Sequence, residues 1–498
     1  MATPLETLAP KGIWEQFDAL RKIPRASKKE ERVREHVRGL FAGRAWEIAG
    51  DATGNTVVRV PGTKGFERAP ITILQSHLDM VTENNSDVKF DWDRDPIDVW
   101  IDGDWVRARG TTLGADNGIG VAAAIASALD PSVVHGPLEL LFTVDEETGL
   151  TGAMGLDPKI LAGRRLINLD SEEDGVLYVG CAGGCNTTIA LRGEMVAPPA
   201  GAAGARVAIT GLTGGHSGGD IHENRANAIK VLARLLARAA GAPAEPGGAA
   251  GADLGVEIAS LAGGNKHNAI PREADAVVAV ASARLGDLRA LAAAEQSRAL
   301  PEFATSDPKL SISVEPADAP RAVFARSDRD RVVALLVALP NGVLSMSRDI
   351  KGLVETSNNL ATVRAGAGVA ETLTSSRSSV MPALRATLDQ VASIARLAGA
   401  ESAKESAGYP GWQPNMASPL LAICKRVQKT LTGSEPQVAA IHAGLETGLI
   451  GEKIPGIDMI SYGPDIRGPH SPDERVKISS VARFWEYHKA VLAELAKG

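Results

Sequence analysis

The segment LELLFTVDEETGLTGA, residues 138–153, decides the fold class. It opens with an apolar run of strand length and then turns to three consecutive carboxylates, Asp145, Glu146 and Glu147. A short apolar run of this kind is typical of a strand buried on both faces of a sheet. Like charges at the end of such a strand repel one another unless cations neutralise them. The segment therefore predicts a covered sheet with a metal site at its edge, against the common alternative of a solvated acidic turn.

Two further apolar runs end in ligand-type residues. ILQSHLDM (73–80) presents His77 and Asp79, and RLINLDSEEDG (165–175) presents Asp170. Residues two apart in a strand share a face, so Asp79 can hold the second ring nitrogen of a metal-binding His77; a structural hydrogen-bonded pair is about as common. Open α/β sheets bind ligands beyond the carboxyl ends of their strands. The three strand ends together predict one shared site.

Two loops add candidates to this site. GTTLGADNGIGVAAA (110–124) presents Asp116 just before an apolar helix that we expect from Gly118. An aspartate at a helix start is most often an N-cap, which is the plainer interpretation of Asp116. ISYGPDIRGPHSPDERV (460–476) places His470 in a loop rich in Gly and Pro between a strand and a helix, which suits a rigidly presented ligand.

The pattern along the chain favours an α/β protein. The first 190 residues alternate strand and helix patterns, and the last hundred repeat that style, so they could complete the same sheet. The elements expected in these two blocks are helices at 14–24, 28–42, 118–129, 417–431 and from about 479, and strands at 55–60, 71–74, 138–144, 166–169, 437–441 and 457–462.

A separate middle segment begins near residue 200, at VAPPAGAAGA, and contains a second flexible stretch at 241–252. We expect one α/β domain from residues 1–194 and 399–498, and an inserted α+β domain over 195–398 with two similar halves. The elements expected within the insert are strands at 206–212, 256–261, 275–282, 310–315, 353–363 and 369–375, and helices at 224–240, 285–299, 327–339 and 382–398.

Composition excludes several classes of protein. The formal net charge is −7 over 498 residues, and no block of five or six Lys and Arg offers a nucleic-acid surface. Three cysteines are too few for a disulfide framework or a four-thiolate zinc site. The N-terminus has no apolar signal core, and no stretch reaches ~20 apolar residues. We expect a cytoplasmic protein with neither nucleic acid nor a membrane as partner.

Taken in order, HLDM, GADNG, DEETGLTGA, INLDSEE, GGHSGGDI and GPHSPDE resemble the motifs of the aminoacyl-histidine dipeptidases, also called cytosol nonspecific or Xaa-His dipeptidases. That family belongs to the co-catalytic zinc exopeptidases, with carnosinase, acetylornithine deacetylase and aminoacylase. The resemblance covers nearly the whole chain. It implies that the α/β domain is catalytic, with a mixed sheet flanked by helices, and that the α+β insert is a lid.

The resemblance also implies a centre of two zinc ions per chain, for which cobalt or manganese could substitute. Asp116 would bridge the two ions. The other ligands implied are His77 and Asp170 for one ion, and Glu147 and His470 for the other.

Catalytic roles follow from the same resemblance. Glu146, which neighbours a ligand without being one, would be the general base that takes a proton from water and delivers it to the leaving amine. Asp79 would orient His77. In LTGGHSGGDIHENRANA (212–228), His216 would reach from the lid and stabilise the oxyanion, an interaction commonly worth a few kcal/mol; local hydrogen bonding in a loop is the alternative.

Four more residues are candidates for binding substrate, each at even odds against a structural role. Arg377 is the preferred partner of a substrate carboxylate, because a planar guanidinium can bind it bidentately. Asn265 could join that clamp. His442 and Glu446 lie in IHAGLETG (441–448), and Glu446 could pair with the free α-amine of a dipeptide.

The expected activity is therefore zinc-dependent hydrolysis of unblocked dipeptides with broad specificity, with Xaa-His peptides as candidate substrates. The alternatives are an N-acyl amino acid deacylase on the same scaffold and a peptide- or metal-binding module without catalysis. A small peptide is the expected partner, and a homodimer is the candidate assembly.

Overall fold

The computed structural model describes residues 3–244 and 247–498. Residues 1–2 of the N-terminal stretch and 245–246 of the flexible stretch at 241–252 lie outside the described residues. The chain forms two compact units, the first comprising Met1–Cys181, Trp412–Ala440 and Leu445–Gly498, and the second Ala182–Gly411 and Ile441–Gly444. The second unit is longer than the insert expected over 195–398, because strands β9 (Gly183–Arg192) and β21 (Ser402–Tyr409) belong to its sheet.

The first unit is built on an eight-stranded mixed sheet in the order β1-β2-β6-β3-β7-β23-β8-β22. Its central strands β6, β3, β7 and β23 run parallel, and β1, β2 and β8 pair antiparallel. The mixed α/β sheet predicted from the sequence is confirmed, with the C-terminal strands completing it. The strands are β1 Glu47–Gly50, β2 Thr56–Val60, β3 Thr72–His77, β6 Leu138–Thr143, β7 Arg165–Asn168, β8 Val176–Cys181, β22 Gln437–Ile441 and β23 Asp458–Ser461.

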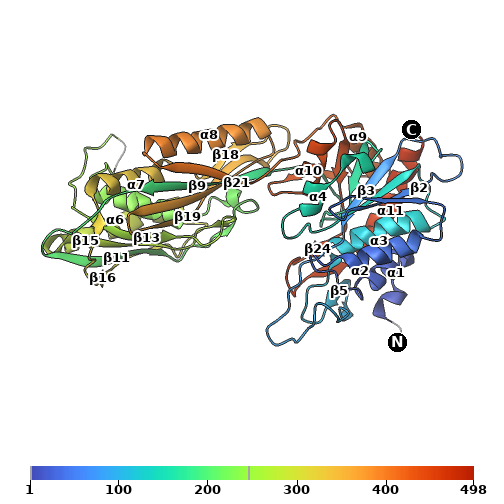
Figure 1. The fold of residues 1–498 in the computed structure, drawn as a ribbon, viewed down its shortest axis with the longest axis horizontal. Helices are drawn as coiled ribbons and strands as arrows, with labels where there is room; N and C mark the ends of the chain where they lie inside the picture. The colour runs from blue at the N-terminus through green and yellow to red at the C-terminus, as the bar shows by residue number, and fades with distance from the viewer. Residues whose placement is uncertain (1–2, 245–246) are drawn as a thin grey trace. The chain divides into compact units, whose positions relative to one another are not determined.

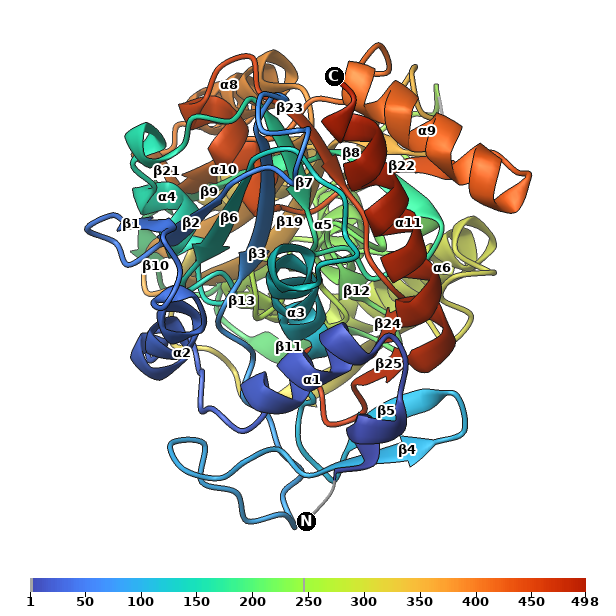
Figure 2. The ribbon, with the colours of Figure 1, turned by 90° about the vertical axis from the view of Figure 1, so that its right-hand side faces the viewer.

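Helices cover both faces of this sheet, which is why every residue of β3 and β6 is buried. Helix α3 (Ala115–Leu129) lies along β3, and α1 (Lys11–Leu20) packs outside α3 (Figures 1 and 2). On the opposite face, α4 (Thr151–Gly155) and α10 (Glu446–Lys453) share a buried cluster with strand residues that include Ile73.

Three more helices and a small sheet complete the first unit. The helices are α2 Glu31–Phe41, α9 Pro419–Thr432 and α11 Ile478–Ala496. The small sheet has the order β24-β25-β5-β4, with strands β4 Val99–Asp102, β5 Trp105–Ala108, β24 Ile466–Arg467 and β25 Arg475–Lys477. These strands are too short for their alternation to be seen in the sequence. Within the described residues, no helix has both the length and the apolar character needed to cross a membrane.

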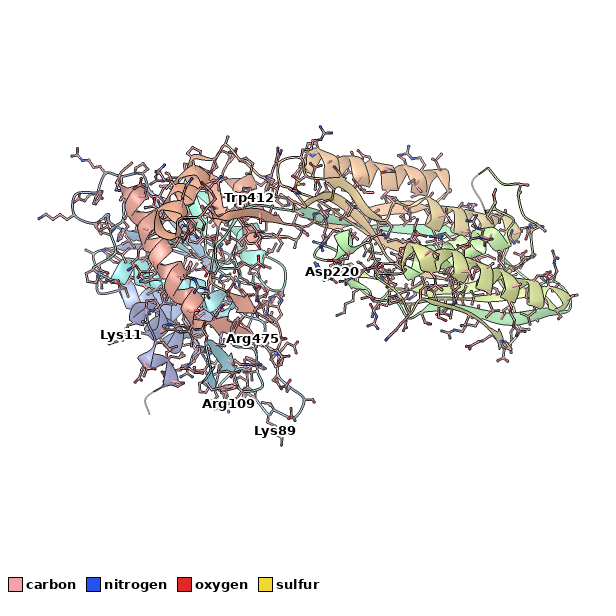
Figure 3. The ribbon with its side chains drawn as sticks, turned by 180° about the vertical axis from the view of Figure 1, so that it is seen from behind. Lys11, Lys89, Arg109, Asp220, Trp412 and Arg475 are labelled. Carbon is pink, nitrogen blue, oxygen red and sulfur yellow. The ribbon has the colours of Figure 1, made fainter. Side chains whose placement is uncertain are left out.

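The second unit contains two short strand pairs, β10 (Met195–Val196) with β17 (Val323–Phe324) and β12 (Gly215–His216) with β14 (Ala269–Ile270), and one large sheet. The large sheet is continuous in the order β16-β11-β15-β13-β19-β20-β9-β21, with β18 added to β19. The two halves expected from the sequence are joined in it, because β19 pairs with β13 on one side and with β20 on the other. Helices lie over one face of the sheet (Figure 3). The remaining strands are β11 Ala202–Thr210, β13 Glu257–Gly263, β15 Ala274–Ala281, β16 Ser311–Ala317, β18 Gly342–Met346, β19 Val354–Gly366 and β20 Val369–Ser378, and the helices are α5 Ala228–Ala239, α6 Leu285–Glu302, α7 Arg326–Ala338 and α8 Met381–Leu397.

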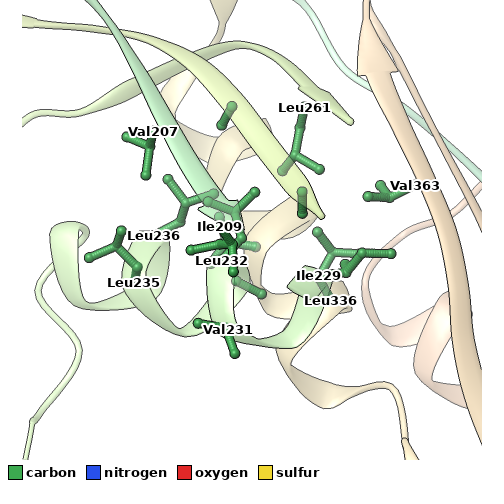
Figure 4. Packing of buried hydrophobic residues seen from close by; sticks show 14 of the residues in the cluster. Val207, Ile209, Ile229, Val231, Leu232, Leu235, Leu236, Leu261, Leu336 and Val363 are labelled. Atoms are coloured by element: carbon green, nitrogen blue, oxygen red, sulfur yellow. The ribbon is translucent and has the colours of Figure 1, made fainter. Parts of the chain in front are cut away.

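Helix α5 is the centre of this unit's core. Its start is fixed by Asn227, whose side chain accepts hydrogen bonds from the backbone N–H groups of Ile229 and Lys230. Its apolar face, which includes Leu232, packs between the sheet and the neighbouring helix α7 (Figure 4).

Leu232→Ala is expected to lower the free energy of unfolding by about 2–5 kcal/mol, because it leaves a cavity in a core that cannot fully collapse. Leu232 is fully buried. The matched control is Leu397→Ala in the same unit, where the side chain is 88% exposed and the change is expected to stay within about 0.5 kcal/mol. Urea denaturation followed by circular dichroism measures both, and equal losses would contradict the assignment of Leu232 to the core.

Candidate active site

Three parallel neighbouring strands bring the first candidate ligands to one edge of the first unit's sheet. His77 is the last residue of β3, Glu146 and Glu147 follow β6, and Asp170 follows β7. Because these strands run the same way, the residues after their carboxyl ends lie close together, as predicted from the sequence.

Asp116 lies at the centre of the group. Its Oδ1 is 3.2 Å from Nε2 of His77, and its Oδ2 is 3.1 Å from Nε2 of His470. His77 Nε2 is in turn 3.3 Å from Asp170 Oδ1, and His470 Nε2 is 3.0 Å from Glu147 Oε2. The N-cap position of α3 is occupied by Gly114, and Asp116 lies two residues further on with a non-helical backbone, so the N-cap interpretation does not describe it.

The residues fit two metal ions that share Asp116. In each of the groups His77/Asp116/Asp170 and Asp116/Glu147/His470, the candidate ligand atoms lie within 4.8 Å of one another. Imidazole nitrogen and carboxylate oxygen are ligands that suit zinc, cobalt and manganese. Within the described part of the chain, the buried Oε1 of Glu147 has no hydrogen-bond partner. Burial, together with neighbouring carboxylates, raises the pKa of Asp170 to about 6, as expected of crowded negative charge without its counter-ion.

Asp79 connects the motif HLDM to the motif DEETGLTGA. Its Oδ1 lies 3.3 Å from His77 Nδ1 and accepts a hydrogen bond from the backbone N–H of Glu146 at 3.0 Å. Its Oδ2 accepts hydrogen bonds from the backbone N–H of Glu147 at 3.2 Å and the hydroxyl of Ser27 at 2.8 Å. Burial opposes ionisation, but these hydrogen bonds and the charge of His77 lower the pKa of Asp79 below its ordinary range. The carboxylate therefore faces the ring of His77 and holds the backbone of both glutamates.

Glu146 belongs to neither of the two groups that share Asp116, but it forms a third candidate group with His77 and Glu147. Its carboxylate lies within 4.8 Å of candidate ligand atoms of His77 and Glu147. Burial raises the pKa of Glu146 well above its ordinary value, and the charge of His77 acts in the opposite direction. Its carboxylate is thus close to the candidate ligands and outside the set that shares Asp116, a position compatible with the proton-accepting role that the resemblance implies.

Three residues that the sequence analysis did not single out hold this group in place. Asn117 donates hydrogen bonds from Nδ2 to Oδ1 of Asp170 and to the carbonyl of Leu169. The other two are Arg25 and Glu474, whose contacts are described below. Asn117 and Glu474 belong to the motifs GADNG and GPHSPDE. The sequence signal for their role was that each of these motifs also contains a candidate ligand.

In the second unit, the surroundings of His216 fix its tautomer. Its Nδ1 accepts hydrogen bonds from the backbone N–H groups of Gly218 at 3.2 Å and Gly219 at 3.0 Å. Burial and the positive charge of Arg377 lower the pKa of His216, so the neutral ring is favoured. A neutral ring that accepts at Nδ1 carries its proton at Nε2. His216 is therefore a hydrogen-bond donor through Nε2.

Arg377 and His442 lie near one another in the same unit. Arg377 on β20 stands opposite Ser357 on β19, which places both side chains on one face of the sheet. Nη1 of Arg377 donates to the hydroxyl of Tyr409 at 2.8 Å, and Nε2 of His442 lies 2.7 Å from the hydroxyl of Ser357. Burial and the charge of Arg377 lower the pKa of His442 to about 3, so this face carries a cation beside a neutral imidazole.

The last two candidates differ in their surroundings. Asn265 is exposed and lines a cavity of about 580 Å³ in the second unit. Glu446 is fully buried in the first unit, where its Oε2 accepts hydrogen bonds from Gln75 at 2.6 Å and Thr143 at 2.7 Å. Burial raises the pKa of Glu446 to about 7. The contact of Glu446 with a substrate amine stays a prediction; among the described residues its buried Oε1 has no hydrogen-bond partner.

The chain belongs to peptidase family M20/M25/M40, whose model matches residues 73–494, a span that includes every candidate ligand. The protein is thus an enzyme of the metallopeptidase class, and the family resemblance predicted from its motifs is confirmed.

Among individual proteins, it is 40% identical over 499 aligned residues to the cytosol non-specific dipeptidase of Escherichia coli (strain K12), with 99% of each chain covered. The structure of aminoacylhistidine dipeptidase from Vibrio alginolyticus superposes with a TM-score of 0.91 at 38% identity, covering 98% of both chains. Aminopeptidase PepT from Bacillus cereus shares the fold, with a TM-score of 0.55 at 16% identity over 98% of this chain and 99% of that one.

Proposed function

We propose that this enzyme is a zinc-dependent dipeptidase that hydrolyses unblocked dipeptides with broad specificity. The observation that carries the proposal is Asp116, whose two carboxylate oxygens face two separate pairs of a histidine and a carboxylate. Divalent ions bound by such a centre lower the pKa of water and polarise the substrate carbonyl.

Side chains of the protein itself then carry out the proton transfers. Glu146 accepts a proton from the attacking water and delivers it to the nitrogen of the leaving amine. Asp79 supports this role because it holds the backbone N–H of Glu146 while facing the ring of His77. The relative positions of ligand and base thus depend on one buried carboxylate.

The second unit is proposed to act as a lid that closes over the substrate and excludes water. His216 would donate its Nε2 proton to the oxyanion of the tetrahedral intermediate, a role supported by the two backbone hydrogen bonds that fix its tautomer. Arg377 would bind the terminal carboxylate of the dipeptide, with His442 and Asn265 as polar neighbours. The bidentate geometry of guanidinium favours a carboxylate over a neutral amide.

Zinc as the native metal and the cytoplasm as the location are parts of the same proposal. The ligand set of imidazole and carboxylate supports zinc while accepting cobalt or manganese. The name of the Escherichia coli relative, cytosol non-specific dipeptidase, supports the location.

Comparing a free dipeptide with its N-acetylated form tests the proposed substrate class. We expect the free dipeptide to have a kcat/KM at least about tenfold higher, a difference of about 1.4 kcal/mol, because both relatives with high identity are named dipeptidases. The assay uses purified protein of known metal content. Glu146→Gln, purified by the same procedure, is the control for contaminating peptidases. Faster cleavage of the acetylated compound would support the N-acyl amino acid deacylase instead.

A further inference from the structure

We propose that Glu474 and Arg25 are positioning residues that hold Asp116 in its bridging orientation and tie the loop of His470 to it. The proposal rests on the metal centre of the proposed function. Neither residue touches a candidate ligand side chain in the contacts described below, and both act through the backbone.

Glu474 takes over the capping of helix α3. The first backbone N–H groups of a helix have no acceptor inside the helix, and a nearby side chain usually supplies one. Oε2 of Glu474 accepts hydrogen bonds from the N–H groups of Leu113 at 2.7 Å and Gly114 at 2.9 Å. Its Oε1 accepts them from Ala115 at 2.8 Å and Asp116 at 3.1 Å. Because Glu474 serves these donors, the carboxylate of Asp116 is left free to face the two histidines.

Arg25 holds the same segment from its carbonyl side. Its Nη1 donates to the carbonyls of Leu78 at 2.9 Å and Asp79 at 2.7 Å, and its Nη2 donates to the carbonyl of Gly114. A side chain at Gly114 would collide with that guanidinium, which explains the glycine there. Arg25 therefore links the loop after His77 to the segment before Asp116.

The two residues also compensate each other's charge. Arg25 is 3% exposed and Glu474 is 2% exposed. Burial lowers the pKa of Arg25, and the negative charge of Glu474 opposes that shift. An ionised side chain is costly to bury unless it is paired and hydrogen-bonded. Two opposite charges that hydrogen-bond to the backbone from its carbonyl side and its N–H side give the segment one defined position.

His470 depends on the same anchor. Its side chain is 53% exposed and its backbone has a φ of +60°, an uncommon conformation for a residue with a side chain. Glu474 lies four residues further along the loop, immediately before Arg475, which is the first residue of strand β25 and is labelled in Figure 3. The four backbone hydrogen bonds of Glu474 thus fix the far end of the loop against the segment that carries Asp116. Loss of Glu474 should weaken the position formed by Asp116, Glu147 and His470 most.

The test is zinc affinity, measured on the full chain by competition with a chromophoric chelator. Glu474→Gln keeps the shape of the side chain but replaces one accepting oxygen with a donor that cannot serve these N–H groups. We expect zinc at one of the two positions to bind about 10–100-fold more weakly, the usual effect of removing a group that orients a ligand. Saturating zinc should restore much of kcat with KM unchanged.

The matched control is Glu139→Gln in the same unit. Glu139 is also buried and accepts hydrogen bonds from the backbone N–H groups of Ala162 and Gly163, but it lies near the start of β6, away from the ligands that follow the strand's end. We expect this variant to unfold at a lower temperature with wild-type zinc affinity. The comparison separates a general loss of stability from a loss of positioning.

Wild-type zinc affinity in Glu474→Gln, or an equal loss in both variants, would overturn the proposal. If Glu474→Gln does not fold, Arg25→Lys tests the proposal in the same assay. Lysine keeps the positive charge of Arg25 but cannot span the three carbonyls. Unchanged zinc affinity in Arg25→Lys would also overturn the proposal. Failure of the proposed function has a different signature, since the wild-type chain itself would then bind no zinc in this competition.

Discussion

Replacing Glu146 with glutamine is expected to lower kcat for dipeptide hydrolysis by about 10²–10⁴-fold, the usual contribution of a general acid–base group. The amide cannot accept the proton from water, and it cannot deliver one to the leaving nitrogen. Because Glu146 lies outside the two groups that share Asp116, the variant should retain its metal ions. Steady-state kinetics and metal analysis on the same sample measure both quantities.

The neighbouring residue supplies the control for this variant. Glu147→Gln changes the same functional group one position along the chain, but it removes a ligand whose Oε2 lies 3.0 Å from Nε2 of His470. Glu147→Gln should therefore lose both activity and metal, whereas Glu146→Gln loses activity alone. Unchanged turnover in Glu146→Gln would remove it from the mechanism.

Replacing Asp116 with alanine is expected to empty both metal positions and to reduce kcat/KM by at least about a thousand-fold. Metal ions contribute several kcal/mol to the stabilisation of charge in the transition state, and each 1.36 kcal/mol is a factor of ten in rate. Asp116 is the residue common to both ligand groups. Metal content after dialysis and activity with added zinc are the measurements.

Asp145→Asn serves as the matched control for Asp116→Ala. Asp145 belongs to the same acidic run, but its carboxylate accepts a hydrogen bond from Thr148 and lies in neither of the two groups that share Asp116. Its positive φ of +50° is a conformation that asparagine tolerates well. The control should keep wild-type metal content, and equal metal loss in the two variants would contradict a specific role for Asp116.

Residues placed by secondary structure were predictable from the sequence. His77, Glu147 and Asp170 each follow an apolar run, and the rule that sites lie beyond strand ends was enough to group them. Asp116 was ambiguous, because the sequence before a helix looks the same whether an aspartate caps it or not. The family resemblance resolved it, and the structure explains the ambiguity by showing Glu474 in the capping position.

Features that depend on contacts between distant segments were not predictable. Glu474 accepts hydrogen bonds from residues some 360 positions away in the sequence, and no local sequence pattern predicts such a contact. Strand β9 was not predicted either, because Gly183 and Gly184 at its start are residues that disfavour a strand. In the structure they are needed because a side chain at either position would collide with Tyr409 or its neighbours. The full burial of Glu446 could not be read from the sequence either, because its partners Gln75 and Thr143 lie on strands far away along the chain.

The two histidines of the site differ sharply in their access to water. The side chain of His77 is 1% exposed and that of His470 is 53% exposed. In the proposed centre, the ion beside His470 would therefore exchange with its surroundings much faster than the ion beside His77. A sample dialysed briefly would be enriched in molecules that keep only the inner ion. Timed exchange against cobalt would then give a hybrid enzyme with a different metal in each half, in which the spectrum of one position could be followed alone.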